Sequence, residues 1–456
     1  MQMMTFKEVS QNIISEFDAN MSQFTKKDWA WTTVLILIII WGSYALYKQI
    51  AEGHGVTGMR DHVVWGLYIA NFIFFIGISY AGAIISALLH FSKLEWGKPI
   101  IRIAKLTTLI AVFIGPIYIL LCVGRFDRLH YLFVYSRLQS PIFWDVIAIC
   151  TFFVGSLIFL YLSLIKDFAI LSVSKVNVGA KRKRLYQWLS LGYQNTPQQR
   201  KKINSSLNII GLIMIPLVVV VSSVLSWIFG MTLRPGWHST IFGPYFVLAA
   251  MYTGTGVIIV LMYLFKKIYH LHDYITQKHF HYMGYVLLVL AAAYGYFTFS
   301  EYLTDWYTSK KWNSDLISKL FNWDEFAPLF LFANVGGIII PILVISISRL
   351  RTIGWITIAS SIMILSMWVK RYLIVIPTLE TTLIPMQDTR QEYIHYSATW
   401  IEWALTAAGI AAFILMFRTI AKFIPIFSVW DATEYVIKSK NGKTEPYKEP
   451  EILTNV

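Results

Sequence analysis

The chain has few cysteines, and this shortage excludes several kinds of cofactor site. Only two occur among 456 residues, Cys122 and Cys150, and both lie in apolar stretches. No CxxC, CxxCH or four-cysteine pattern is present. Iron–sulfur clusters and structural zinc are held by sets of thiolates at such spacings, and c-type haem is attached through CxxCH. We therefore expect the chain to hold none of these groups through its own thiolates.

Charged residues are also scarce. They make up 14% of the sequence, whereas a soluble domain carries about 25%. Hydrophobic residues make up 56%, and they gather in runs long enough to cross a bilayer, about 20 residues each. The net charge of +14 does not indicate a nucleic-acid partner, because Lys and Arg cluster in loops between these runs, as membrane topology requires. The composition predicts a polytopic helical membrane protein in contact with the lipid bilayer.

The apolar runs are expected to be helices, because alternating strand patterns are absent and backbone groups in lipid must be hydrogen-bonded internally. Ten transmembrane spans are predicted, at residues 29–50, 62–90, 99–123, 141–170, 206–230, 243–269, 279–303, 326–348, 353–376 and 397–426. The expected fold class is therefore all-α, a polytopic integral membrane protein.

The loops on the two sides of the membrane differ in charge. One side carries the basic 171–204 loop and the Lys-rich tail after Asp431, whereas the opposite loops are richer in Asp and Glu. The positive-inside rule places both termini in the cytoplasm, which for a bacterium means a protein of the inner membrane. The basic 181–202 stretch is expected to form either a short interfacial helix or a solvated loop.

Spans two to five and six to nine share a faint repeat, since each set includes an acidic outer loop followed by a helix that begins with proline. An even number of spans separates the sets, so the repeat predicts two parallel four-helix bundles. The predicted segments are a cytoplasmic N-terminal segment (1–28), a flanking helix with its loop (29–61), a first bundle (62–230), a second bundle (231–376), a last flanking helix (377–427) and a cytoplasmic tail (428–456). Phe332 stands where the first bundle has Asp145, so the chemistry is expected in the first bundle.

Ionisable residues gather at the outer end of the fourth predicted span. Asp145 lies about one turn inside that end, and Asp127 and His130 lie in the loop before it. A charge at this depth is costly and marks a functional site by default. A histidine and a carboxylate near one interface suit a quinone site, where they hydrogen-bond the quinone oxygens and exchange protons. In the structural alternative, Asp145 caps the helix, His130 is an interfacial anchor and Asp127 pairs with neighbouring arginines.

Other polar residues extend this candidate site. Asp61 and His62 stand at the outer start of the second predicted span, although Asp61 also suits a helix N-terminus. Polar side chains inside the first bundle make a candidate proton path through Ser79, Tyr80, Thr107, Thr108 and Lys105. Such hydroxyls also serve helix packing, which is the favoured interpretation. Lys370 and Arg371, near the outer end of the ninth span, are expected to snorkel toward the interface.

A haem or an intramembrane metal centre is not expected. A b-type haem needs two histidines on facing helices at a suitable depth. The ten histidines of this chain all lie near the ends of predicted spans or in loops.

Four stretches together resemble the NrfD/polysulfide-reductase membrane-subunit family. They are the second span HVVWGLYIANFIFFIGISYAGAIISALL and the shorter stretches GRFDRLHYLF, SPIFWD and PGWHSTIFGPYFV. The resemblance covers roughly residues 55–430. The ten spans and the GWHSTIF stretch are most similar to its longer branch, which includes the quinol-binding membrane subunits of bacterial alternative complex III.

The resemblance implies a site for menaquinone or ubiquinone at the outer face of the first bundle, formed by His130 and Asp145 with Asp127 and Asp61 nearby. It implies no cofactor of the subunit's own. The implied partners are an extracytoplasmic iron–sulfur subunit, multihaem cytochrome or molybdopterin subunits, and other membrane subunits. Relatives in the longer branch tend to have histidine where this chain has Tyr80. Since tyrosine titrates near 10, coupling to proton translocation is left open.

Two other functions fit the sequence. A secondary transporter should show broken helices and polar groups near the bilayer midplane. Pro216 and Pro341 could break spans five and eight, but no charged partner is expected mid-span. A structural anchor would hold soluble subunits without binding quinone. The sequence favours a quinone-interacting membrane subunit of a respiratory oxidoreductase over both.

Overall fold

The computed structural model describes residues 26–92, 94–174, 180–232, 234–269, 271, 274–381 and 395–433. The predicted cytoplasmic N-terminal segment up to residue 25 and the predicted tail after residue 433 lie outside the described residues. So do residues 382–394, which belong to the predicted last flanking segment (377–427).

Within the described residues, ten helical spans are long and apolar enough to cross a membrane, and no strand is present. Nine are single helices: α2 (Lys26–Glu52), α3 (Gly66–Ser92), α4 (Lys98–Val123), α6 (Pro141–Val173), α8 (Pro197–Gly230), α9 (Phe242–Ile268), α10 (Gln277–Thr308), α14 (Ile353–Glu380) and α15 (Trp400–Phe423). The eighth span is composite, with α12 (Ala327–Asn334), a π-helical turn η4 (Val335–Ile339) and α13 (Ile340–Ser346). The all-α polytopic fold predicted from the apolar runs is confirmed.

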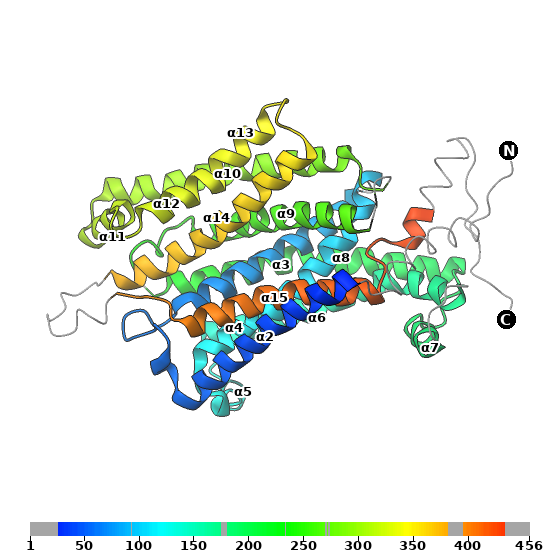
Figure 1. Cartoon of the computed structure of the whole chain (residues 1–456), viewed down its shortest axis with the longest axis horizontal. Coiled ribbons are helices and arrows are strands. Elements are labelled where there is room, and N and C mark those ends of the chain that lie inside the picture. The colour runs from blue at the N-terminus through cyan, green and yellow to red at the C-terminus, as the bar shows by residue number, and fades with distance from the viewer. Residues whose placement is uncertain are drawn as a thin grey trace.

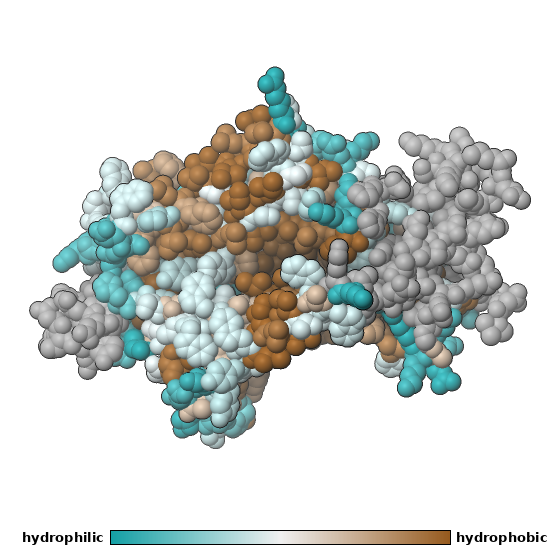
Figure 2. Space-filling model, in the orientation of Figure 1, coloured by the Kyte–Doolittle hydropathy of each residue, from teal (hydrophilic) through white to brown (hydrophobic). Residues whose placement is uncertain are grey.

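Short helices lie between the spans. They are α5 (Tyr131–Val134), α7 (Ala180–Leu189), α11 (Lys311–Phe321) and the 3-10 turns η1 (His54–Val56), η2 (Glu95–Gly97) and η3 (Phe126–Arg128). Figure 1 shows α5 and α11 toward one end of the molecule and α7 at the other. Of the two alternatives for the basic stretch after residue 180, a short helix is present. Figure 2 shows hydrophobic side chains over the middle of one face and hydrophilic ones mainly toward its edges, as expected for a protein surrounded by lipid.

Helix α3 is the central element. It is apolar all round, nearly all of its residues are buried, and it contacts α4, α8, α9, α14 and α15. Figure 1 shows it in the middle of the bundle, between α9 and α15. Gly254 of α9 permits a close crossing with α3, because a Cβ there would overlap the side chain of Ala81 and lie 3.0 Å from the carbonyl oxygen of Ile78.

The helices pack in two closed rings. Helices α3, α4, α6 and α8 contact one another in that cyclic order, and so do α9, α10, α13 and α14. The rings are joined where α3 packs on α9 and α14, while α2 pairs with α15 beside α4. The predicted domain boundaries stay a prediction.

A buried ion pair closes the first ring at the end where α4 begins and α6 ends. The Arg102 guanidinium of α4 donates to the Asp167 carboxylate of α6, and both side chains are buried. Arg102 also donates to the carbonyl oxygens of Pro425 and Phe427, and Asp167 accepts from the Trp430 backbone nitrogen at 3.1 Å. The pair therefore fixes the segment after α15 against α4 and α6.

Three local expectations need correction or refinement. Helix α3 begins at Gly66, so His62 precedes the second span instead of starting it. Pro216 does not break the fifth span, since α8 continues through it. In the eighth span, the π-helical turn comes directly before the short helix that contains Pro341.

Candidate functional site

Asp145 is a buried carboxylate in the first ring, near the start of α6. Pro141 occupies the first turn of α6, where its missing N–H costs nothing, and Ser140 precedes it as the N-cap residue. Asp145 is therefore inside the helix and not at its cap. Its side chain is only 5% exposed, and within the described part of the chain its Oδ1 has no hydrogen-bond partner. Burying a polar atom without a hydrogen-bond partner costs free energy, so we expect a further group to bond to this oxygen.

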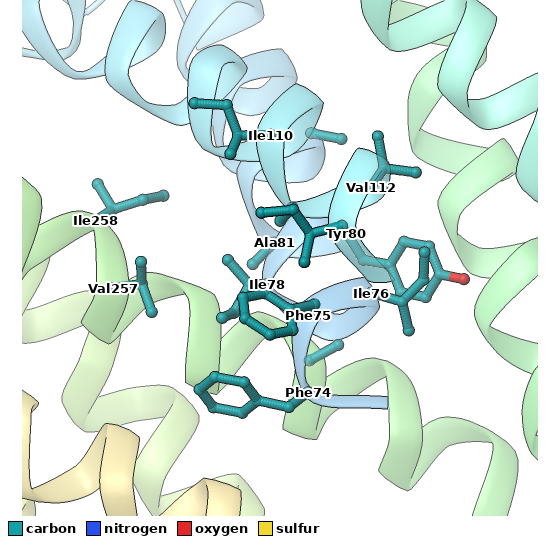
Figure 3. Close-up of a cluster of buried hydrophobic side chains, with 14 of the residues drawn as sticks. Phe74, Phe75, Ile76, Ile78, Tyr80, Ala81, Ile110, Val112, Val257 and Ile258 are labelled. Atoms are coloured by element: carbon teal, nitrogen blue, oxygen red, sulfur yellow. The ribbon is translucent and has the colours of Figure 1, made fainter. Parts of the chain in front are cut away.

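Tyr80 is the second unsatisfied polar group in this ring. It lies near the middle of α3 and is 1% exposed, and its hydroxyl bonds to no described residue. Its ring packs edge-on against Phe152 of α6, with centroids 5.3 Å apart. Asp145 stands two helical turns before Phe152 on α6, which places these two side chains on the same face of that helix. Figure 3 shows that this hydroxyl points away from Val257 and Ile258 of α9. Tyr80 and Asp145 thus face the same interior from opposite helices.

The loop before α6 leaves its ionisable groups exposed. Asp127 is exposed and accepts two hydrogen bonds from Arg125, both at 3.0 Å. These bonds hold the pKa of the Asp127 carboxyl below its usual value. Asp127 therefore stays ionised at neutral pH and is a poorer proton acceptor than an unpaired carboxylate. The ion-paired alternative for this residue is present in the structure.

His130 is also exposed, just before α5, with its ring 4.4 Å from that of Tyr131. No hydrogen bond or ion pair between described residues joins it to Asp145. The two residues expected to act together therefore lie at different depths, Asp145 inside the helix bundle and His130 at the surface.

Asp61 and His62 lie in the turn before α3. Asp61 is exposed and His62 is half-buried. Because α3 starts at Gly66, Asp61 does not occupy the helix N-terminus that the sequence suggested. The geometry leaves both residues in the outer loop.

The hydroxyls of the candidate proton path bond to their own helices. Ser79 donates to the Ile76 carbonyl oxygen at 2.6 Å, and Thr107 and Thr108 donate to carbonyl oxygens one turn back at 2.7 and 3.0 Å. Such bonds are common for Ser and Thr in membrane helices. Lys105 is buried, with its Nζ 3.6 Å from the centre of the Phe159 ring. No hydrogen bond within the described ranges connects Tyr80 to Lys105, and the proton path stays a prediction.

Sequence reasoning missed a buried charged cluster in the second ring. Lys370 and Arg371 were expected to snorkel near the end of their span, but each is only 2% exposed, and α14 continues for nine residues beyond them to Glu380. Glu301 of α10 is buried beside them, and Lys370 donates to the hydroxyl of Tyr302 at 2.5 Å. The available signal was the adjacent Lys–Arg pair followed by the apolar stretch YLIVIP.

Comparisons with known proteins agree on the kind of protein. Residues 55–382 match the family described as polysulphide reductase, NrfD. One subunit of the selenate reductase of Mesobacillus selenatarsenatis is 22% identical over 91% of this chain and 97% of its own length. A putative dimethyl sulfoxide reductase membrane subunit of Halobacterium salinarum is 28% identical over 54% of this chain and 53% of its own. The integral membrane subunit of a menaquinone reductase of Nitratidesulfovibrio vulgaris is 29% identical over 30% of this chain and 32% of its own.

Proposed function

Because the chain belongs to the NrfD polysulphide reductase family, we propose that it is the subunit at which a respiratory oxidoreductase exchanges electrons and protons with the membrane quinone pool. The family and its relatives support a membrane subunit of a reductase complex. The quinone site is our proposal, and one observation carries it. Asp145 is a buried carboxylate whose Oδ1 is not hydrogen-bonded by any described residue.

The polar groups of the first ring fit a quinone head group. Asp145 offers a carboxylate oxygen, and Tyr80 offers a hydroxyl that remains protonated at neutral pH. Both atoms are buried, and each lacks a hydrogen bond to the described residues. The Phe152 ring, which packs edge-on against Tyr80, supplies an apolar aromatic wall. This arrangement provides one proton acceptor and one hydrogen-bond donor in a site that largely excludes water.

A bound quinol supplies the redox chemistry, since its oxidation releases two electrons and two protons. Asp145 accepts one of the two protons at its carboxylate oxygen and the other leaves by way of His130, while Tyr80 orients the head group by donating a hydrogen bond. His130 is exposed at the surface, where it can pass protons to the outer water. The surface positions of Asp61 and His62 suit a role at the water side of the site, whereas Asp127 is already paired with Arg125 and has no part in the proposed reaction. Coupling to proton translocation stays a prediction, because no connected path toward the inner side is defined.

The proposed partner subunits follow from the redox cofactors that this chain lacks the residues to bind. With two cysteines and no CxxCH motif it has no thiolate site for a redox cofactor, so electrons must pass to another subunit. We propose an extracytoplasmic iron–sulfur subunit, linked to molybdopterin or multihaem subunits. The names of the selenate and dimethyl sulfoxide reductase relatives support a multisubunit complex, and that of the menaquinone reductase relative supports menaquinone. The closer likeness to alternative complex III stays a prediction.

The proposed location is the bacterial inner membrane, with both termini cytoplasmic. Its support is the distribution of Lys and Arg, which gather in the 171–204 loop and in the tail after Asp431. The outer loops then carry Asp127 and His130. A purely structural anchor would not need a buried carboxylate such as Asp145, whose burial costs free energy.

Photolabelling of the intact complex tests the quinone site. The complex in lipid nanodiscs is irradiated with an azido-substituted menaquinone, and the labelled peptides are identified by mass spectrometry. We expect label in the first turns of α6 and in the facing part of α3, with excess unlabelled menaquinone suppressing it. The Asp145→Asn variant should show weaker labelling there, whereas Asp127→Asn should match the wild type. The proposal fails if neither α6 nor α3 takes up label that unlabelled quinone can suppress.

A further inference from the structure

A large groove opens along the outer half of the second helix ring, away from Asp145. Its volume is ≈ 770 Å³, within the range of small-molecule sites. It runs along α10 from Ala292 to Trp306, a length of about 21 Å at 1.5 Å per residue. Helices α11, α12 and α13 and the π-helical turn η4 supply the remaining walls, and the lining side chains are almost all apolar. The shape suits one long hydrocarbon chain.

The π-helical turn shapes one wall of this groove. Ile338 and Ile339 of η4 line it, and Tyr252 of α9 donates from its hydroxyl to the Gly337 carbonyl oxygen at 2.6 Å. The hydrogen bond thus satisfies a carbonyl oxygen in a turn that departs from the regular α-helical hydrogen-bonding pattern. Single π-turns inside α-helices often occur at functional sites.

Polar groups stand at one end of the groove. Tyr302 lines both the groove and a smaller cavity of ≈ 30 Å³ that Glu301 and Lys370 also line. The Tyr302 hydroxyl accepts a hydrogen bond from Lys370, so its own hydrogen remains to be donated. Glu301 is 7% exposed, and its Oε2 lacks a partner among the described residues. Phe330 packs edge-on against Tyr302 with centroids 5.2 Å apart, which gives an aromatic wall for a planar ring.

The charges of this cluster favour a neutral ligand. Lys370 and Arg371 contribute two positive charges, and Glu301 and Asp305 contribute two carboxyls, so the formal charges balance. A phospholipid phosphate would meet no excess of positive charge here. The carbonyl or hydroxyl oxygen of a neutral head group can accept a hydrogen bond from Tyr302. A hydroxyl of the same head group can donate to Glu301 if the Tyr302 ring turns and so joins the two cavities.

We propose that this groove is a second binding site for a prenylated quinone, with the isoprenoid chain along α10 and the head group at Tyr302. The site is distinct from the one at Asp145, in the other ring of helices. We assign it binding only and no redox step. Its existence does not depend on the proposed reaction at Asp145.

The test counts quinones bound to the intact complex. The complex is placed in nanodiscs of quinone-free phosphatidylcholine and equilibrated with a short-chain menaquinone. Bound quinone is then extracted and quantified per chain. We expect two equivalents for the wild type and one for Ala292→Trp, which fills the groove from an exposed position. Val289→Trp is the matched control, because Val289 is an exposed residue one turn away that does not line the groove. It should retain both.

A second variant tests the head-group contact. Tyr302→Phe keeps the ring that packs on Phe330 but removes the hydroxyl, so affinity for the second equivalent should fall about tenfold. Tyr307→Phe, at an exposed position near the outer end of α10, should leave it unchanged.

Three outcomes would overturn the inference. One is an unchanged count in Ala292→Trp, another is an unchanged affinity in Tyr302→Phe, and the third is a groove that retains phospholipid instead of menaquinone. The Asp145→Asn variant separates this inference from the proposed function. If Asp145→Asn keeps both equivalents and full turnover while Ala292→Trp loses one equivalent, the reaction at Asp145 fails and the groove site stands.

Discussion

Replacing Asp145 with asparagine should lower quinol-dependent turnover by about 100-fold or more, while the complex still assembles. Asparagine has nearly the same shape but cannot accept a proton, and a positioned acid or base contributes about 10²- to 10⁴-fold to a rate. The carboxylate is buried, with an oxygen that no described residue satisfies, so the neutral amide should not reduce stability. Turnover is measured with a soluble quinol analogue, and assembly by co-purification of the other subunits.

Asp127→Asn is the matched control for this substitution. It makes the same chemical change on the outer side, but at an exposed carboxylate already paired with Arg125. Turnover in this variant should stay within about twofold of the wild type, since exposed ion pairs contribute little. Equal turnover in Asp145→Asn and the wild type would instead favour a structural anchor. Substrate flux through the isolated subunit would favour a transporter.

The second large effect is expected at the inner end of the same ring. Asp167→Ala should destabilise the protein by about 3–5 kcal/mol, the usual cost of leaving a buried charge without its partner. Arg102 would remain buried with only carbonyl oxygens to bond, and the Trp430 backbone nitrogen would lose its acceptor. The measurement is the denaturation midpoint of the purified complex, together with the yield of folded protein.

A double substitution shows whether this loss comes from the uncompensated charge. Arg102→Met with Asp167→Leu replaces the pair by apolar side chains of similar size and should recover much of the stability. Arg418→Met, which removes the less buried pairing with Asp28, is a milder comparison. If the denaturation midpoint of Asp167→Ala equals that of the wild type, the ion pair between Arg102 and Asp167 does not stabilise the protein.

The sequence predicts the spans well because they are a local property. A run of about 20 apolar residues must be helical in lipid whatever surrounds it, and all ten spans are present. Helix ends were less certain, as the start of α3 at Gly66 shows. The turn before α3 contains no strong start signal, and the preceding apolar residues extend the pattern outward. The π-helical turn at Val335–Ile339 could not be predicted either, since it depends on contacts with α9 and α14.

The candidate site was predicted only in part. Asp145 could be found because a carboxylate inside an apolar run is visible in the sequence. Its relation to Tyr80 could not, because it depends on α3 and α6 facing each other across a ring of four helices. The burial of Lys370 and Arg371 was missed for the same reason. A lysine near a helix end snorkels or is buried according to its neighbours, and here α9 and α10 cover it.

The central claim is that Asp145 exchanges a proton with a quinone bound in the first helix ring. Redox-induced infrared difference spectroscopy on the intact complex tests it most directly. Reducing and reoxidising the bound quinone should produce a carboxyl band that is present in the wild type and in Asp127→Asn but absent in Asp145→Asn. The same band persisting undiminished in Asp145→Asn would contradict the account.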